Sequence, residues 1–328
     1  MNKKQDKKKS KVFTILKWII LGLFFFIFFV ITTLLLINNV KFLRKPTLNF
    51  IVSIVNSSLT GKIEIGDLHF QSLNHIEIND FKLLAANDTL AQFKKLDLKF
   101  FLLELLNNNI KIKYLKLYNT RVKLLRSKTD SLWNFDKIAP PSESNSPPGK
   151  SPLIFIQNLQ LFDTYIVLKD STFFIPELPF NPLDLKFNNL NLEIAAELDF
   201  NSSKIHSIIK NFKFDEENTG FSVKSLNFEA TLDSTLMNVD KMKMELENSS
   251  LNLTAHFANY SPLSLQQNND ILKSKIDISF DATNFSTTEI KRFAFVPLNS
   301  SQTANIKFRA KGSFQDLDID TMNIQLAS

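Results

Sequence analysis

The chain of 328 residues contains no cysteine, which excludes disulfide bonds, thiolate chemistry and cysteine metal sites. Glycine is scarce, with 6 residues, and the 4 histidines are scattered. The sequence has no HExxH, no GxSxG and no phosphate-binding loop. We therefore predict neither an enzyme nor a cofactor, and a chain held together by backbone pairing and apolar burial alone.

Two patterns could suggest metal ligands, but both have a simpler interpretation. His69 and His75 lie six residues apart near polar turns and are better explained as surface histidines. Asp316, Asp318 and Asp320 resemble the start of a calcium loop, yet the glycine at the sixth place and the closing glutamate are absent. A solvated strand face explains them better, so no metal site is predicted.

The charge is concentrated at the N-terminus. Against 33 Asp and Glu the chain has 39 Lys and Arg, a formal net charge of +6, and seven of these cations lie in residues 1–17 beside the single acid Asp6. The remainder is close to neutral, so we predict no nucleic-acid partner.

Residues 18–37 read WIILGLFFFIFFVITTLLLI, a run without any charge. As a helix this run would reach ~30 Å, the thickness of a bilayer's hydrocarbon core. The basic side stays cytoplasmic, so the rest of the chain would lie across the membrane, in the periplasm of a bacterium. A cleaved signal peptide is the alternative, but no small-x-small site follows the run. We predict an uncleaved, single-pass anchor.

After the anchor, the sequence predicts a short amphipathic helix followed by strands. Pro46 can begin the helix and Gly61 can end it in a left-handed cap. From Lys62 onward apolar and polar residues alternate, with one slip between Ile78 and Phe81. Run after run has one apolar and one wet face, which is typical of an antiparallel sheet covered on one side.

Three segments depart from this alternation or end it. Residues 100–106, FFLLELL, could form a helical turn or a buried strand end, and periodicity does not decide. Residues 139–152 are rich in proline and serine and predict an exposed loop. The alternation then continues to the last residues, so we predict a strand over 322–326 with an unpaired outer edge.

Several short segments carry a resemblance to a known family: residues 60–68 (TGKIEIGDL), 74–81, 115–122, 130–136, 284–293 and 310–319. Together with the order of basic tail, anchor and short helix, they resemble the start and the repeat units of AsmA-like and TamB-like proteins of Gram-negative envelopes. The richness in Asn, Lys, Ile and Phe is similar to that of Bacteroidota sequences.

The resemblance implies a mainly β fold, an elongated, repeating antiparallel sheet shaped as a β-groove or taco. Its apolar interior would carry phospholipid acyl chains from the inner toward the outer membrane, with an outer-membrane β-barrel as a possible partner. In a closed β-sandwich the same apolar residues would instead pack on one another, and the sequence leaves both arrangements open. The candidate lipid-facing residues are Ile63, Ile65, Ile76, Ile78, Leu96, Leu98, Ile110, Ile112, Leu115, Leu117, Val122 and Leu124.

The predicted organisation is a cytoplasmic tail (1–17), an anchor (18–37), a helix with a first β-groove module (38–138), a loop (139–152) and a continuing β-groove (153–328), incomplete at its C-terminus. The predicted function is phospholipid transport and envelope integrity at the bacterial inner membrane. The alternative is a scaffold for outer-membrane protein assembly that pairs through an exposed sheet edge.

Overall fold

The computed structural model describes residues 41–57, 59–85, 88–107, 109–129, 132–138, 153–172, 180–199, 204–233, 235–259, 274–292, 302–313 and 315–327. The predicted tail and anchor (1–37) and the predicted loop (139–152) lie outside these residues. Within them, no helix has the length and apolar character needed to cross a membrane.

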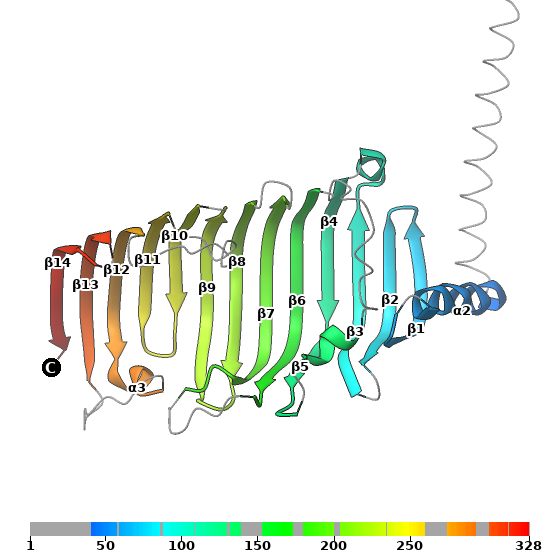
Figure 1. Ribbon diagram of the computed structural model, residues 1–328, viewed down its shortest axis with the longest axis horizontal. Coiled ribbons are helices and arrows are strands. Elements are labelled where there is room, and N and C mark those ends of the chain that lie inside the picture. Colours follow the sequence, from blue (N-terminus) through cyan, green and yellow to red (C-terminus); the bar gives the residue numbers. More distant parts are fainter. Residues whose placement is uncertain are drawn as a thin grey trace, which may run out of the picture.

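The described residues form one long sheet of 14 strands that runs across Figure 1. This confirms the mainly β fold and the elongated sheet. The strands are β1 (Lys62–Ser72), β2 (His75–Ala85), β3 (Asp88–Phe100), β4 (Asn109–Tyr118), β5 (Arg121–Arg126), β6 (Leu153–Asp170), β7 (Asp184–Asp199), β8 (Lys204–Glu216), β9 (Phe221–Leu232), β10 (Leu236–Glu245), β11 (Ser250–Ala258), β12 (Lys275–Ser286), β13 (Thr303–Ser313) and β14 (Leu317–Ala327).

Neighbours in the sheet follow the chain order, with one exception. β5 continues the line of β4 and lies between β3 and β6, so thirteen strands form the main path from β1 to β14. All paired strands are antiparallel except that β4 and β5 run parallel to β6. The prediction of antiparallel pairing throughout was therefore wrong at this point. At ~4.8 Å per strand, twelve spacings give a sheet ~58 Å long.

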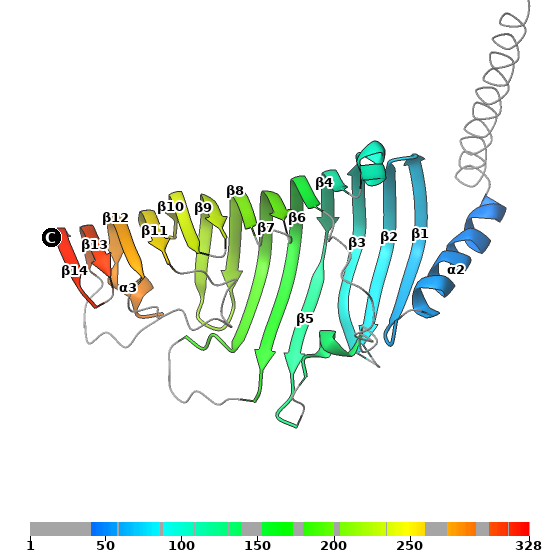
Figure 2. The ribbon, with the colours of Figure 1, turned by 45° about the horizontal axis from the view of Figure 1, so that its top comes forward.

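Within the described residues, four helices accompany the sheet: α2 (Lys41–Ser57), η1 (Leu102–Asn107), η2 (Asn134–Lys137) and α3 (Thr287–Ile290). They contact it only locally, with α2 on β1, η1 on β4, η2 on β5 and β2, and α3 on β12 (Figure 2). Ser286 caps α3, because its side chain accepts a hydrogen bond from the Thr288 N–H.

The first helix differs from its prediction at both ends. α2 begins at Lys41, so Pro46 lies inside it and deprives it of one internal hydrogen bond. Gly61 is not among the described glycines with positive φ and therefore forms no left-handed cap. A Cβ atom at position 61 would lie 2.6 Å from the Leu84 carbonyl oxygen, so a close backbone approach explains this glycine.

The sheet is a single layer over its described length. All described strands belong to the one sheet, and no second sheet faces it within the described ranges. Burial is correspondingly thin: one core cluster, formed by Val223, Leu246, Leu251 and Ala282, packs against neighbouring phenylalanines of β8, β9 and β12. The closed β-sandwich is therefore not the arrangement of the described strands.

Irregular backbone positions keep the apolar side chains on the same face of the sheet where the alternation of the sequence slips by one residue. Asp80 has φ 52° and lies where the sequence slips between Ile78 and Phe81. Asp163, Asn189, Lys241 and Asn284 have positive φ at similar positions within strands, and Asn119 has it between β4 and β5. Because successive strand side chains point to opposite faces, one extra residue would turn the next apolar side chain outward unless the backbone absorbs it. These positions absorb it.

Candidate functional site

The strand register joins apolar residues into a row that crosses the whole sheet. Residues directly opposite each other on paired strands share a face of the sheet. Starting from β1, each residue of the row is the register partner of the next, and every one is apolar. We call these thirteen residues the apolar row: Leu68, Ile78, Leu96, Leu117, Leu161, Leu192, Phe212, Leu226, Met244, Leu251, Ala282, Ile306 and Ile324.

All twelve sequence-predicted residues lie on the face that contains the apolar row. Each of them has an apolar register partner, as in the pairs Ile63–Leu83, Ile65–Phe81, Ile76–Leu98, Ile78–Leu96, Leu96–Leu117, Leu98–Leu115, Ile110–Ile154, Ile112–Ile156, Leu115–Leu159, Leu117–Leu161, Val122–Ile166 and Leu124–Leu168. Ile63 is buried, and the other eleven are half-buried. The structure thus brings the twelve residues together on one face of the sheet. On this face each side chain is partly covered by the side chains of adjacent strands.

The sequence analysis expected the β-groove to continue over residues 153–328 but named no candidate residue beyond Leu124. Leu161, Leu192, Phe212 and Leu226 extend the same row, and they come from strands of the same alternating pattern. The signal was present in the sequence, as in Leu159 and Leu161 around Gln160. What the sequence lacked was the register that places these residues in line with Leu117.

The opposite face of the sheet is polar and laced with ion pairs. Lys95 Nζ lies 2.9 Å from Glu77 Oε2, and its hydrogen bond lowers the pKa of Glu77 while raising the pKa of the lysine. His75 Nε2 lies 2.7 Å from Asp97 Oδ1 and 3.1 Å from the Tyr114 hydroxyl. The two faces of one sheet therefore differ sharply in chemistry.

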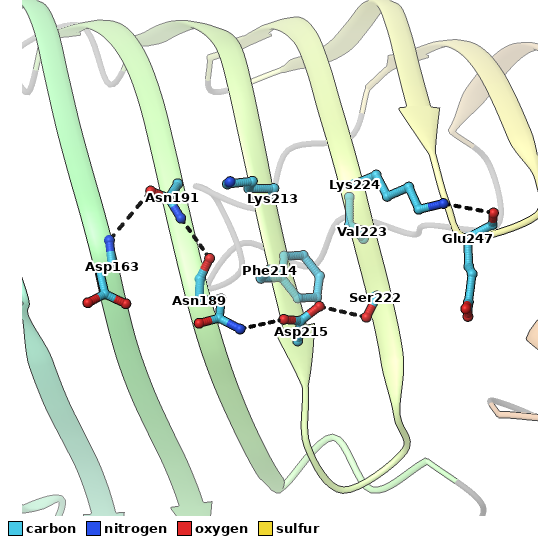
Figure 3. A pocket seen from close by; sticks show the side chains of 10 residues that line it. All are labelled: Asp163, Asn189, Asn191, Lys213, Phe214, Asp215, Ser222, Val223, Lys224 and Glu247. Atoms are coloured by element: carbon cyan, nitrogen blue, oxygen red, sulfur yellow. Dashed lines mark hydrogen bonds between the residues drawn. The ribbon is translucent and has the colours of Figure 1, made fainter.

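A polar pocket of about 640 Å³ lies on this second face, over β6 to β9 (Figure 3). Its side chains bond one another: Asn189 Nδ2 donates to Asp215 Oδ2 at 2.8 Å, and the Ser222 hydroxyl donates to Asp215 Oδ1 at 2.6 Å. These two bonds lower the pKa of Asp215, the one from Ser222 most. The neighbouring Lys224 donates to the backbone oxygen of Glu247. The polar side chains of the pocket thus bond one another and the backbone, next to the positive-φ residues Asp163 and Asn189.

The residues considered as metal ligands are explained by ordinary pairing. His69 Nε2 lies 2.9 Å from Asp67 Oδ2 on β1, whereas His75 pairs with Asp97. Asp318 and Asp320 lie on β14. In the described part of the chain, no three His, Cys, Asp or Glu side chains are grouped so that they could hold a metal ion.

Buried carboxylates organise the edge of the sheet where β6 and β8 end. Glu216 loses hydration through burial, yet its pKa is lowered because it accepts hydrogen bonds from Thr219 and from the backbone N–H groups of Lys186 and Asn218. Glu289 of α3 likewise accepts from the Asn248 N–H at 2.9 Å and from the Ser249 hydroxyl. These acids hold turns in place.

The chain matches no known protein family, and neither a curated protein nor a solved structure is similar to it at a significant level. The functional argument therefore rests on the sequence and on the two-faced sheet.

Proposed function

We propose that the chain takes part in phospholipid transport and that its sheet carries acyl chains on the face of the apolar row. The observation that supports this most is continuity, since thirteen register-paired residues are apolar without a polar interruption. A transport surface needs such continuity, because a single buried charge or unpaired polar group along the path would stop an acyl chain.

The proposed chemistry is a passive exchange of contacts. An acyl chain leaving a bilayer for the apolar row exchanges one apolar surface for another, while its head group stays in water. Each methylene kept out of water is worth ~0.8 kcal/mol, so a long chain binds by area alone. No catalytic residue or cofactor is required. Direction would come from partners, among them the outer-membrane β-barrel that the family resemblance implies.

The proposed location follows from residues 18–37. We place this uncharged run in the bacterial inner membrane as an anchor, with the basic tail in the cytoplasm and the sheet in the periplasm. In this arrangement α2, which begins at Lys41, leaves the membrane directly and attaches the sheet through β1.

A second candidate function is a scaffold for outer-membrane protein assembly, and the last strand favours it. Among the described strands, β14 pairs with β13 alone. Its apolar side chains are exposed, including Ile319, Met322 and Leu326. An added strand could pair with this edge. The scaffold needs only the edge, whereas transport needs the whole face.

The test of transport is the lipid content of the purified full chain. We expect solvent extraction followed by mass spectrometry to release phospholipid from the wild type. Leu192→Glu places a charge in the middle of the apolar row and should reduce that content several-fold. The matched control is Lys116→Glu, a charge on the polar face, which should leave it unchanged. Equal lipid content in both folded variants, or none in the wild type, would favour the scaffold.

A further inference from the structure

One edge of the sheet carries an exposed apolar projection that the proposed transport function does not use. η1 lies between β3 and β4 and is the helical turn above these strands in Figure 1. Its leucines are unusually exposed: Leu102 44%, Leu103 75%, Leu105 45% and Leu106 83%. We call these four residues and Leu73, which is 39% exposed, the leucine rim.

Hydrogen bonds between Asn74 and Phe100 bring the turn that contains Leu73 close to the start of η1. The turn between β1 and β2 contains Leu73, and its neighbour Asn74 exchanges hydrogen bonds with Phe100 at the end of β3. The Phe100 N–H donates to the Asn74 carbonyl at 3.0 Å, and the Asn74 side chain donates to the Phe100 carbonyl at 2.9 Å. β3 leads directly into η1, so the turn and the helix lie side by side at the same edge.

The geometry of η1 places its four leucines on two faces of the helix. In a 3₁₀ helix residues three apart share a face. Leu103 and Leu106 form the most exposed face, and Leu102 and Leu105 form a second one. Glu104 lies on neither, since its carboxylate is 3.6 Å from Lys111 Nζ.

The base of η1 is held in place. The N–H of Phe101 donates to the Lys111 carbonyl at 2.8 Å, and the ammonium of Lys111 lies 5.2 Å from the centre of the Phe101 ring. These contacts with Lys111 fix η1 in position, so its four leucines stay exposed to solvent.

We propose that the leucine rim inserts into the surface of the membrane in which residues 18–37 are anchored; this rests on the anchor of the proposed function. Exposed apolar patches of this kind mark interaction sites. Two observations select a bilayer as the occupant. The uncharged run ends at Ile37, four residues before α2, and α2 packs on β1, so the rim over β1 to β4 lies at the sheet end nearest the expected membrane. Lys99, Lys111 and Lys113 near its base suit anionic head groups.

A fluorescent label attached to an introduced cysteine can test this proposal. Because the chain has no cysteine of its own, the label reacts only at the introduced position. The full chain is reconstituted in vesicles of phosphatidylethanolamine and phosphatidylglycerol with brominated acyl chains. An environment-sensitive fluorophore is attached at Leu106→Cys or at Glu217→Cys. Glu217 is an exposed residue after β8, at the opposite edge of the sheet. We expect the label at position 106 to be quenched several-fold more strongly than the label at 217, and Leu103→Asp to remove most of that difference.

Equal quenching at positions 106 and 217 in a folded chain would overturn the inference. Flotation with the vesicles reports the anchor separately, and a chain that fails to float would overturn both the anchor and the rim. If the purified full chain holds no phospholipid but the label at position 106 is still quenched more strongly than the label at 217, transport is contradicted and the membrane contact of the leucine rim is supported.

Discussion

The side chain of Asn56 binds both backbone polar groups of Ile63. Its Oδ1 accepts the Ile63 N–H at 2.6 Å, and its Nδ2 donates to the Ile63 carbonyl at 3.1 Å. A strand neighbour would make the same two bonds. Asn56 of α2 thus takes the place of a neighbouring strand at the outer edge of β1. Without it, the unpaired backbone groups of Ile63 could pair with a strand of another chain.

Asn56→Ala should destabilise the protein, because it leaves both groups of a buried residue without this partner. An unsatisfied buried donor or acceptor costs ~1–3 kcal/mol, which should appear in the free energy of unfolding from a denaturant titration. Asn56→Asp keeps the acceptor and loses the donor, so it should fall between the wild type and alanine. Unchanged stability in the alanine variant would show that water replaces the cap.

Gly66→Ala should destabilise the β1–β2 pair through a steric conflict. A Cβ atom at position 66 would lie 2.9 Å from the Cβ atom of Asp80, so one of the strands must shift. We expect a loss of ~1–3 kcal/mol in the free energy of unfolding. Asp80→Gly removes the conflicting atom and suits the positive φ of that position.

The double variant Gly66→Ala/Asp80→Gly should therefore recover most of the loss. Residues in direct conflict couple by ~0.5–3 kcal/mol in a double-mutant cycle. Additive effects of the two substitutions would contradict the conflict as the reason for the glycine.

The pair Arg126–Asp170 should make stability depend on acid pH. A hydrogen bond from Arg126 holds the pKa of Asp170 well below its usual range, and bonds from Thr172 act in the same direction against burial. The unfolded pKa is ~3.9, so the stabilisation is complete above about pH 5 and is lost as the pH falls through the lowered folded value.

Arg126→Gln should reduce this dependence. Without the guanidinium the folded pKa rises toward the unfolded one, so less stability is lost on acidification and the melting temperature at pH 7 is lower. Melting curves from pH 2 to pH 7 measure both effects. Parallel pH profiles for the wild type and the variant would show that Arg126 does not control the titration of Asp170.

Thr164→Val should maintain or raise stability. The Thr164 side chain is 1% exposed, and its hydroxyl has no hydrogen-bond partner in the described structure. An isosteric methyl removes the cost of an unsatisfied group, a gain of ~1 kcal/mol in the free energy of unfolding. Thr164→Ser keeps the hydroxyl and loses the methyl, so it should destabilise. The reverse order of the two variants would reveal a partner for the hydroxyl.

Much of the sheet could be predicted from local alternation. The strand period of two assigned Ile110 and Ile112 to one face and Lys111 to the other, because side-chain direction is a local property of the backbone. The slip between Ile78 and Phe81 was equally visible, and the structure places Asp80 there with positive φ. Such features need no knowledge of partners.

The remaining features depend on contacts between distant segments. The parallel pairing of β4 with β6 follows from the path of the chain between them, which periodicity does not encode. Periodicity also left residues 100–106 undecided: the four leucines there would suit a buried strand end, but the structure forms η1 over Leu102–Asn107 and exposes all four. The two bonds of Asn56 connect a helix to a strand seven residues later and leave no pattern in composition.

The most direct test of the transport face compares two neighbouring residues of β4. Leu117 belongs to the apolar row, and Lys116 alternates with it onto the polar face. A photo-crosslinking amino acid is placed at either position in the full chain in cells, and covalent lipid adducts are measured by mass spectrometry after irradiation. The transport account predicts phospholipid adducts at position 117 and few or none at 116, with both variants folded. Equal adducts at the two positions, or none at 117, would contradict it.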